Sequence, residues 1–332
     1  MPVGIIVSIF GLLGNAISIL VWRRILKKNT AGNKSTGIYL LVLGIADSGL
    51  LVFFLLTDSL PVSFPSVSST APFCFFYAYI GFPLFFFFIA VSIWLVVGVT
   101  LNRFLMVLFP IKSKKWCSKS RAYLGIIIIS VCCFIINVPH FFNFRPQETN
   151  GTYSIAQTEY AASGGSKNYE FWVHCMFLVL APWASIAFFN GGIIYSLMKR
   201  ANAIKAKFGE SKNKEREAKD KQMTVMLLTV TFSFLILLAF QCITQCFYML
   251  KFGSGTSKWD LVDKSYAFAK MGVVFYSAIN FVLYCCTGTQ FRKELMSMFR
   301  RGGRARYLSN TRSTGSATAL TVTHSPMIDS QH

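Results

Sequence analysis

Five polar side chains interrupt long apolar stretches of this 332-residue sequence, and their types and spacing are suited to ion chemistry. Asp47 supplies a carboxylate, whereas Asn15, Ser92, Ser277 and Asn280 supply hydroxyl and amide oxygens from three other stretches. One carboxylate with several neutral oxygens suits a small cation such as sodium. The same set would also serve as a hydrogen-bonded core that specifies how helices pack. Both interpretations stay open at this point.

The sequence offers no catalytic arrangement beside these residues. It contains no His-Glu-x-x-His pattern, no pair of aspartates within an apolar stretch and no Ser/His constellation. Its nine cysteines lie mostly within the apolar stretches, so they do not indicate the disulfide framework of a small secreted domain. We therefore expect a protein that is not an enzyme and has no cofactor, apart from a sodium ion as an allosteric ligand.

The elements that must position these side chains are seven apolar runs. The chain is 54% hydrophobic and only 14% charged, unlike a soluble domain. A helix needs about 20 mostly apolar residues to cross a bilayer. Seven runs meet this requirement: Val3–Trp22, Ile38–Thr57, Phe82–Leu108, Tyr123–Val138, Phe171–Leu197, Met223–Leu250 and Tyr266–Cys286. The sequence therefore predicts an all-α membrane protein, a bundle of seven transmembrane helices.

The net charge of +20 is distributed unevenly between the connections. The first, third and fifth connections and the C-terminal tail carry 27 lysines and arginines, against 5 in the other connections. Basic residues concentrate on the cytoplasmic side of membrane proteins. We predict a multi-pass plasma-membrane protein with an extracellular N-terminus and a cytoplasmic C-terminus. The basic residues flank the membrane and face anionic lipid, so nucleic acid is not the expected partner.

Two connections and the start of the chain lead to further expectations. Asn150-Gly151-Thr152 is a glycosylation sequon in the predicted extracellular segment His140–Glu170. A charged cytoplasmic loop is expected over Lys199–Gln222. The first span begins almost at Met1 without the basic start of a signal peptide, which favours an uncleaved span; a missing extracellular stretch is the alternative.

The chain divides into three parts. Residues 1–286 form the predicted seven-span domain, residues 287–300 a short amphipathic helix and residues 301–332 a disordered cytoplasmic tail. The apolar residues of the middle part share one helical face: Phe291, Leu295, Met298 and Phe299. This pattern is typical of a helix that lies on the inner leaflet, with a frayed tail as the alternative. The Ser/Thr-rich tail is too polar to fold and can be phosphorylated into an acidic docking segment.

Arg103 ends the third span, where an arginine can simply extend its charge toward the interface. Other motifs follow in order along the chain: Gly14-Asn15, Ala46-Asp47, Asn102-Arg103-Phe104, Pro182, Asn280-Phe281-Val282-Leu283-Tyr284 and Phe291-Arg292. Through all seven spans, this order and spacing resemble the rhodopsin-like (class A) G-protein-coupled receptors. Four details look like the invertebrate FMRFamide-type neuropeptide receptors: Asn190–Ile194, Thr224–Leu228, Asn137–Phe142 and Asn280-Phe281.

The resemblance implies roles for particular residues. Three of them match the family's internal sodium site: Asp47, Ser92 and Asn280. Arg103, between Asn102 and Phe104, matches the arginine that engages a heterotrimeric G protein when the sixth helix swings outward. Tyr284 matches the tyrosine that moves in to support it. An agonist would shift a pre-existing equilibrium toward the open conformation. Arrestin and receptor kinases are further expected partners.

The chain departs from the family pattern at three positions. Asn102 stands where the family usually has an acid, so the partner that restrains Arg103 at rest is missing and raised basal signalling is one consequence. Leu238 and Phe240 occupy the sites of the usual sixth-helix tryptophan and proline, which removes a rotamer switch and a kink. Transmission through the sixth helix must then differ from the usual scheme, or the protein has diverged from signalling.

Cys74 resembles the cysteine that ties the third helix to the second extracellular loop in the family, but its usual partner is missing. That loop has no cysteine between His140 and Glu170. Cys175 is the nearest alternative partner, and a free Cys74 is the other outcome.

The residues near the predicted outer end narrow the ligand class. Phe85 and Val274 stand where amine receptors carry an aspartate and opsins a lysine, so neither class is expected. The remaining candidates for ligand contact are Tyr77, Phe85, His174, Gln241, Gln245, Tyr248, Lys270 and Tyr276. Aromatic, amide and cationic groups suit a short amidated (RFamide-like) neuropeptide, although an aromatic stripe is also typical of a core or lipid-facing surface.

Two other functions compete with a peptide receptor. A small membrane transporter would show inverted repeats and broken helices at corresponding positions, and the sequence shows no such duplication. A divergent heptahelical protein without G-protein coupling remains open because of Asn102, Leu238 and Phe240.

Overall fold

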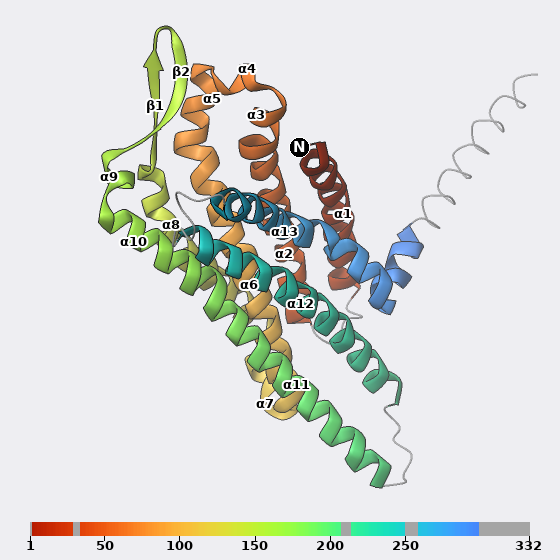
Figure 1. Cartoon of the computed structure of the whole chain (residues 1–332). Helices are drawn as coiled ribbons and strands as arrows, with labels where there is room; N and C mark the ends of the chain where they lie inside the picture. The colour runs from red at the N-terminus through yellow and green to blue at the C-terminus, as the bar shows by residue number, and fades with distance from the viewer. Residues whose placement is uncertain (1, 29–33, 207–213, 250–257, 299–332) are drawn as a thin grey trace, which may run out of the picture.

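The computed structural model describes residues 2–28, 34–206, 214–249 and 258–298, apart from some side chains within these ranges (Figure 1). Within this part of the chain, seven long helical segments pack into one bundle. Five of the described segments are long and apolar enough to cross a membrane, and α12 and α13 contain the shorter apolar stretches Gln222–Leu237 and Val274–Thr287. The predicted seven-helix fold is confirmed.

The first three spans form the N-terminal half of the bundle. The first is α1 (Pro2–Lys27). The second is α2 (Lys34–Phe54), continued by the π-helix η1 (Leu55–Ser59) and α3 (Leu60–Ser63). After α4 (Pro65–Ser68), the third consists of α5 (Ala71–Phe76), the π-helix η2 (Tyr77–Gly81) and α6 (Phe82–Leu108).

The remaining spans follow a short helix, α7 (Pro110–Trp116). The fourth is α8 (Lys119–Asn137), which ends in the 3-10 turn η3 (Val138–Phe142). After the strands β1 (Phe144–Thr149) and β2 (Thr152–Gln157) come α9 (Glu159–Ala162) and α10 (Gly164–Trp172). The last three spans are the π-helix η4 (Val173–Leu180) with α11 (Ala181–Ala206), α12 (Lys214–Met249) and α13 (Lys258–Thr287).

The third span lies at the centre of the bundle. In its most apolar window 61% of the residues are buried, whereas the corresponding share in the fourth span is 22%. The core contains Leu43 of α2, Leu95 of α6 and Met226 of α12. On α8, by contrast, Ile127 and Ile135 are more than half exposed, as expected for a helix that faces lipid.

The bundle has two ends that differ in structure (Figure 1). The hairpin end carries β1 and β2, and the α7 end carries α7 and a further helix over residues 289–298. At the hairpin end, the Tyr153 amide donates a hydrogen bond to the Ser69 carbonyl at 3.3 Å. At the α7 end, Lys28 forms an ion pair with Glu294 at 2.6 Å.

The antiparallel β1–β2 hairpin is a feature that we did not predict from the sequence. Its strands pair from Phe144 with Gln157 to Thr149 with Thr152, so only two residues form the turn. These are Asn150 and Gly151, both at positive φ (52° and 76°). Such a turn demands a left-handed backbone at both positions, and Asn-Gly is the preferred pair because both residues adopt it readily. The same Asn150 also belongs to the predicted sequon.

The expected loop over Lys199–Gln222 is shorter than predicted. The helix α11 continues to Ala206, and α12 already begins at Lys214. The added turns are rich in alanine, lysine and glutamate, which favour helix even where no packing partner is present. Both helices therefore extend past the apolar residues that define their spans.

Candidate functional site

Asp47 lies at the centre of a buried hydrogen-bond network. Its Oδ1 atom accepts hydrogen bonds from the hydroxyls of Ser92 on α6 (2.5 Å) and Ser277 on α13 (3.2 Å). Its Oδ2 atom accepts one from the Asn280 amide at 2.7 Å. The Asn15 amide of α1 donates to the Ser277 carbonyl at 3.0 Å. All five residues are at most 2% exposed. Three helices thus meet at the Asp47 carboxylate, and α1 joins the network through the Ser277 carbonyl.

The charge of Asp47 is not balanced by a basic side chain in the part of the chain that the structure describes. The one ion pair found there joins Lys28 to Glu294. A buried charge without a partner is costly, so this carboxylate requires either a proton or a cation. Asn280 Oδ1 is buried and accepts no hydrogen bond from described residues. One carboxylate, two hydroxyls and an open amide oxygen fit a small hard cation.

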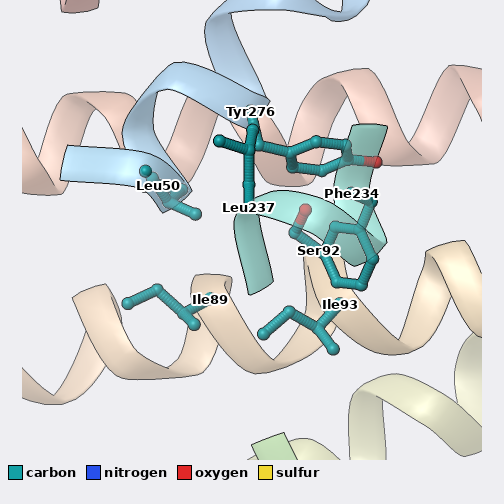
Figure 2. A pocket seen from close by; sticks show the side chains of 8 residues that line it. Leu50, Ile89, Ser92, Ile93, Phe234, Leu237 and Tyr276 are labelled. Carbon is teal, nitrogen blue, oxygen red and sulfur yellow. The ribbon is translucent and has the colours of Figure 1, made fainter. Parts of the chain in front are cut away.

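A small cavity adjoins this network between α2, α6, α12 and α13, and Figure 2 shows its lining. The lining residues are Leu50, Ile89, Ser92, Ile93, Phe234, Leu237, Gly272 and Tyr276. Tyr276, one of the predicted ligand contacts, is only 3% exposed and its ring centroid lies 4.7 Å from that of Phe234. The structure therefore places Tyr276 beside the Ser92 hydroxyl, in the interior of the bundle.

Asn102 and Arg103 lie at the α7 end of α6, and both are buried. The Asn102 side chain accepts a hydrogen bond from the Ser35 hydroxyl at 3.2 Å and donates one to the Thr36 hydroxyl at 2.9 Å. Both the oxygen and the nitrogen of the Asn102 amide are thus hydrogen-bonded to side chains in the first turn of α2. Arg103 is 2% exposed and its guanidinium contacts the Met106 sulfur at 4.0 Å.

Phe104 and Tyr284 make aromatic contacts between helices near the α7 end of the bundle. The Phe104 ring packs against Phe189 of α11, with centroids 5.2 Å apart. Tyr284 of α13 forms an edge contact with Trp22 of α1 at 5.9 Å and a tilted contact with Phe291 at 5.5 Å. Tyr284 therefore belongs to an aromatic cluster that joins α1, α13 and the helix at 289–298.

The predicted ligand contacts fall into two groups. Tyr77 lies in η2 at the hairpin end, where its ring centroid is 5.7 Å from that of Phe144. Phe85 is buried on α6 and packs against Phe54 of α2 at 6.2 Å. The remaining candidates have side chains outside the described part of the structure: His174, Gln241, Gln245, Tyr248 and Lys270.

Asp58 is a candidate that sequence reasoning missed. It lies in η1 near the hairpin end, is half-buried, and accepts a hydrogen bond from the Thr57 hydroxyl at 3.0 Å. The segment η1 is a π-helix, as are η2 and η4, and π-helical turns occur often at functional sites. The sequence does offer a signal for this residue, because an acidic side chain directly follows the predicted second span.

Cys74 is buried and forms no disulfide with any cysteine that the structure describes. Its thiol donates a hydrogen bond to the Ser68 carbonyl at 3.3 Å. The hairpin is instead attached through aromatic rings. The Phe144 ring of β1 packs against Phe82 at 4.8 Å, and His140 packs against Phe86 at 4.8 Å. These rings hold the hairpin at the start of α6.

The helix α12 runs without interruption over 36 residues. Phe240 stands where the family has a proline, and its side chain is exposed; the side chain of Leu238 lies outside the described residues. Midway along α12, Thr231 accepts a hydrogen bond from the Asn190 amide of α11 at 2.9 Å. Both partners are buried.

A seven-helix bundle with a buried carboxylate at its centre and an arginine at one end defines a heptahelical membrane receptor. The sequence profile of the seven-transmembrane receptors of the rhodopsin family matches residues 14–284, and the chain belongs to this family. It is therefore a multi-pass membrane protein, and the resemblance inferred from its motifs is confirmed. The family is one of receptors and not of enzymes.

Three curated relatives are similar to the chain. The FMRFamide receptor of Drosophila melanogaster is 23% identical over 314 residues, which cover 89% of this chain and 52% of the relative. Sex peptide receptor-related protein 2 of Caenorhabditis elegans is 22% identical over 242 residues (64% and 52%). The human B1 bradykinin receptor is 24% identical over 217 residues (64% and 59%). The chain thus spans between half and three fifths of the length of these relatives.

Proposed function

We propose that this chain is a plasma-membrane receptor that couples an extracellular peptide to a heterotrimeric G protein. The Asp47 network carries the proposal, because it joins α2, α6 and α13 at the level between the hairpin end and Arg103. A ligand that shifts these helices at one end changes the packing around the network. The change then reaches Arg103 along α6.

The hairpin end is extracellular in this proposal. The connections at this end carry 5 basic residues, against 27 in the connections and tail at the α7 end. Asn150 lies exposed at the tip of the hairpin, where a glycan could be attached. The helix at 289–298 lies on the inner leaflet, with Phe291 turned into the bundle.

The ligand is a short neuropeptide of RFamide type. Relatives named as an FMRFamide receptor and as B1 bradykinin receptors support a peptide ligand. The aromatic residues of the hairpin end offer flat apolar surfaces, and Asp58 offers a carboxylate. Such a set suits a peptide that ends in a basic and an aromatic residue.

Activation involves outward movement of α12 and exposure of Arg103 to the G protein. Arg103 is buried in this structure, and Tyr284 is held in the cluster with Trp22 and Phe291. In the active conformation both side chains leave these positions, and Tyr284 supports Arg103. Receptor kinases and arrestin act on the Ser/Thr-rich tail after activation.

Asp47, Ser92 and Asn280 form the site of an allosteric sodium ion. A bound cation would supply the positive charge that Asp47 lacks among described residues. The serine hydroxyls that donate to Asp47 would turn their oxygens toward it. Sodium then stabilises the resting conformation, in which α2, α6 and α13 stay close together.

The test of this function is a peptide screen in transfected cells. RFamide and related peptides are applied to cells that express the chain, and calcium or cAMP is recorded. Nucleotide exchange on co-expressed G proteins is measured in parallel. A response to RFamide peptides supports the proposal. No exchange with any G protein, despite surface expression, favours the alternative of a receptor-like protein without G-protein coupling, which Asn102 and the proline-free α12 also favour.

A further inference from the structure

Near the α7 end of the bundle, which is the inner end in the proposed orientation, α12 contacts a short junction that follows α13. The junction is Gly288 together with Thr289, the first residue of the helix at 289–298. The junction continues the helical hydrogen bonding, because the Gly288 amide donates to the Tyr284 carbonyl at 2.9 Å. The Arg292 amide in turn donates to the Gly288 carbonyl at 2.9 Å. The backbone of the junction is therefore fixed by its own chain.

The junction is also anchored to α1. Phe291, two residues beyond it, is 1% exposed and its ring centroid lies 5.7 Å from that of Trp22. One turn further, Glu294 forms the 2.6 Å ion pair with Lys28. Because α1 and α13 also pack against each other, the junction is attached to both of these helices.

Two side chains of α12 meet this anchored junction. The Thr289 hydroxyl donates a hydrogen bond to Gln222 Oε1 at 2.5 Å. Met226 packs over Gly288 so closely that a Cβ atom there would lie 2.7 Å from its sulfur. Gln222 and Met226 are four residues apart, so one face of α12 makes both contacts.

A gap remains between these contacts and the aromatic cluster. It is lined by Trp22, Gln222, Met223, Met226, Gly288, Thr289, Gln290 and Phe291. The Gln222–Thr289 hydrogen bond and the Met226–Gly288 contact thus border imperfectly filled space. Contacts of this kind break at small cost.

We propose that Gln222–Thr289, with Met226 on Gly288, is the latch that holds α12 against α13 in the resting conformation. Asn102 does not perform this restraint, because both functions of its amide are engaged by Ser35 and Thr36. The latch extends the proposed function, since outward movement of α12 must break the hydrogen bond. It sets how often the conformation opens without a ligand.

The experiment uses the full chain in nanodiscs, without ligand. Spin labels are placed at the exposed positions Val225 on α12 and Met296 on the helix at 289–298, and the distances between them are measured. Thr289→Val removes the donor and keeps the shape, so we expect the open population to rise roughly two- to tenfold, the effect of one ordinary hydrogen bond. Thr289→Ser keeps the donor and should behave as the parent chain.

Gln222→Ala breaks the same hydrogen bond from α12 and serves if Thr289→Val folds poorly. The double variant should open no further than either single variant, because they share one interaction. An unchanged distance distribution in the single variants overturns the latch. A shifted distribution with no nucleotide exchange in any variant leaves the latch standing and removes the G-protein proposal.

Discussion

The Asn102 amide donates a hydrogen bond to the Thr36 hydroxyl at 2.9 Å, and this bond ties the end of α6 to the start of α2. The family's usual acid at this position cannot donate such a bond. A carboxylate would instead accept from this hydroxyl, and it would carry the negative charge that the Asn102 amide lacks. In this chain the restraint acts between α6 and α2, next to Arg103.

We predict that Asn102→Asp lowers basal signalling. A carboxylate beside the buried Arg103 would attract its guanidinium and favour the resting conformation. An added restraint of about 1 kcal/mol lowers basal nucleotide exchange roughly fivefold. Exchange is measured on membranes with matched receptor amounts, with Asn102→Gln as the uncharged control. Equal basal exchange in the parent and the aspartate variant would contradict this role.

Arg103→Ala should abolish any agonist response while surface expression stays intact. The guanidinium is the group proposed to engage the G protein, and alanine leaves nothing to replace it. Ligand-stimulated exchange and cell-surface labelling are measured together. Arg103→Lys keeps the charge without the planar fork and should retain only part of the response. Full signalling by the alanine variant would remove Arg103 from the coupling site.

Asp47→Ala should abolish the sodium sensitivity of agonist affinity. The substitution removes the one carboxylate of the network, so the remaining neutral oxygens lose their affinity for a cation. Agonist competition is measured in sodium and in an organic cation at equal ionic strength. Asp47→Asn, which keeps the shape of the side chain, is the matched control and should also be insensitive. A sodium response that survives in both variants argues against an ion site here.

The hairpin should remain in place under reducing conditions. Cys74 forms no disulfide with a described cysteine, so Cys74→Ser and added reductant should leave hydrogen exchange of residues 144–157 unchanged. Phe144→Ala removes ring contacts with Tyr77 and Phe82, each of about 1 kcal/mol, and should speed this exchange roughly tenfold or more. Phe75→Ala is the control, because this ring is exposed at the same end. Faster exchange on reduction would reveal a disulfide after all.

The sequence was sufficient to predict the spans and the depth of their polar residues. Each of Asp47, Ser92 and Asn280 lies inside an apolar run, and helices that cross the same bilayer can bring such residues to one level. A buried polar residue then turns toward the others, because lipid offers it no partner. The three therefore meet in the structure as the family resemblance implied.

Other features depend on how each helix rotates and on local turns. Tyr276 was predicted as a ligand contact; the structure places it with Ser92 in the lining of a small interior cavity, a depth that periodicity does not reveal, and its contact with a ligand stays a prediction. The hairpin was missed because Asn150-Gly151 was considered as a sequon and not as a turn. The contact between Gln222 and Thr289 joins residues 67 positions apart through the packing of α12 on α13, which single-chain patterns do not encode.

The unbroken α12 has a mechanical consequence. With neither proline nor glycine among its 36 residues, it is a rod about 54 Å long that has no internal hinge. The Asn190–Thr231 hydrogen bond attaches α12 to α11 near the midpoint of α12, so this point can act as a pivot. A displacement of one half of this rod therefore moves the other half in the opposite direction by a similar amount. In the proposed function, a bound ligand would thus move the far end of α12 without bending the helix.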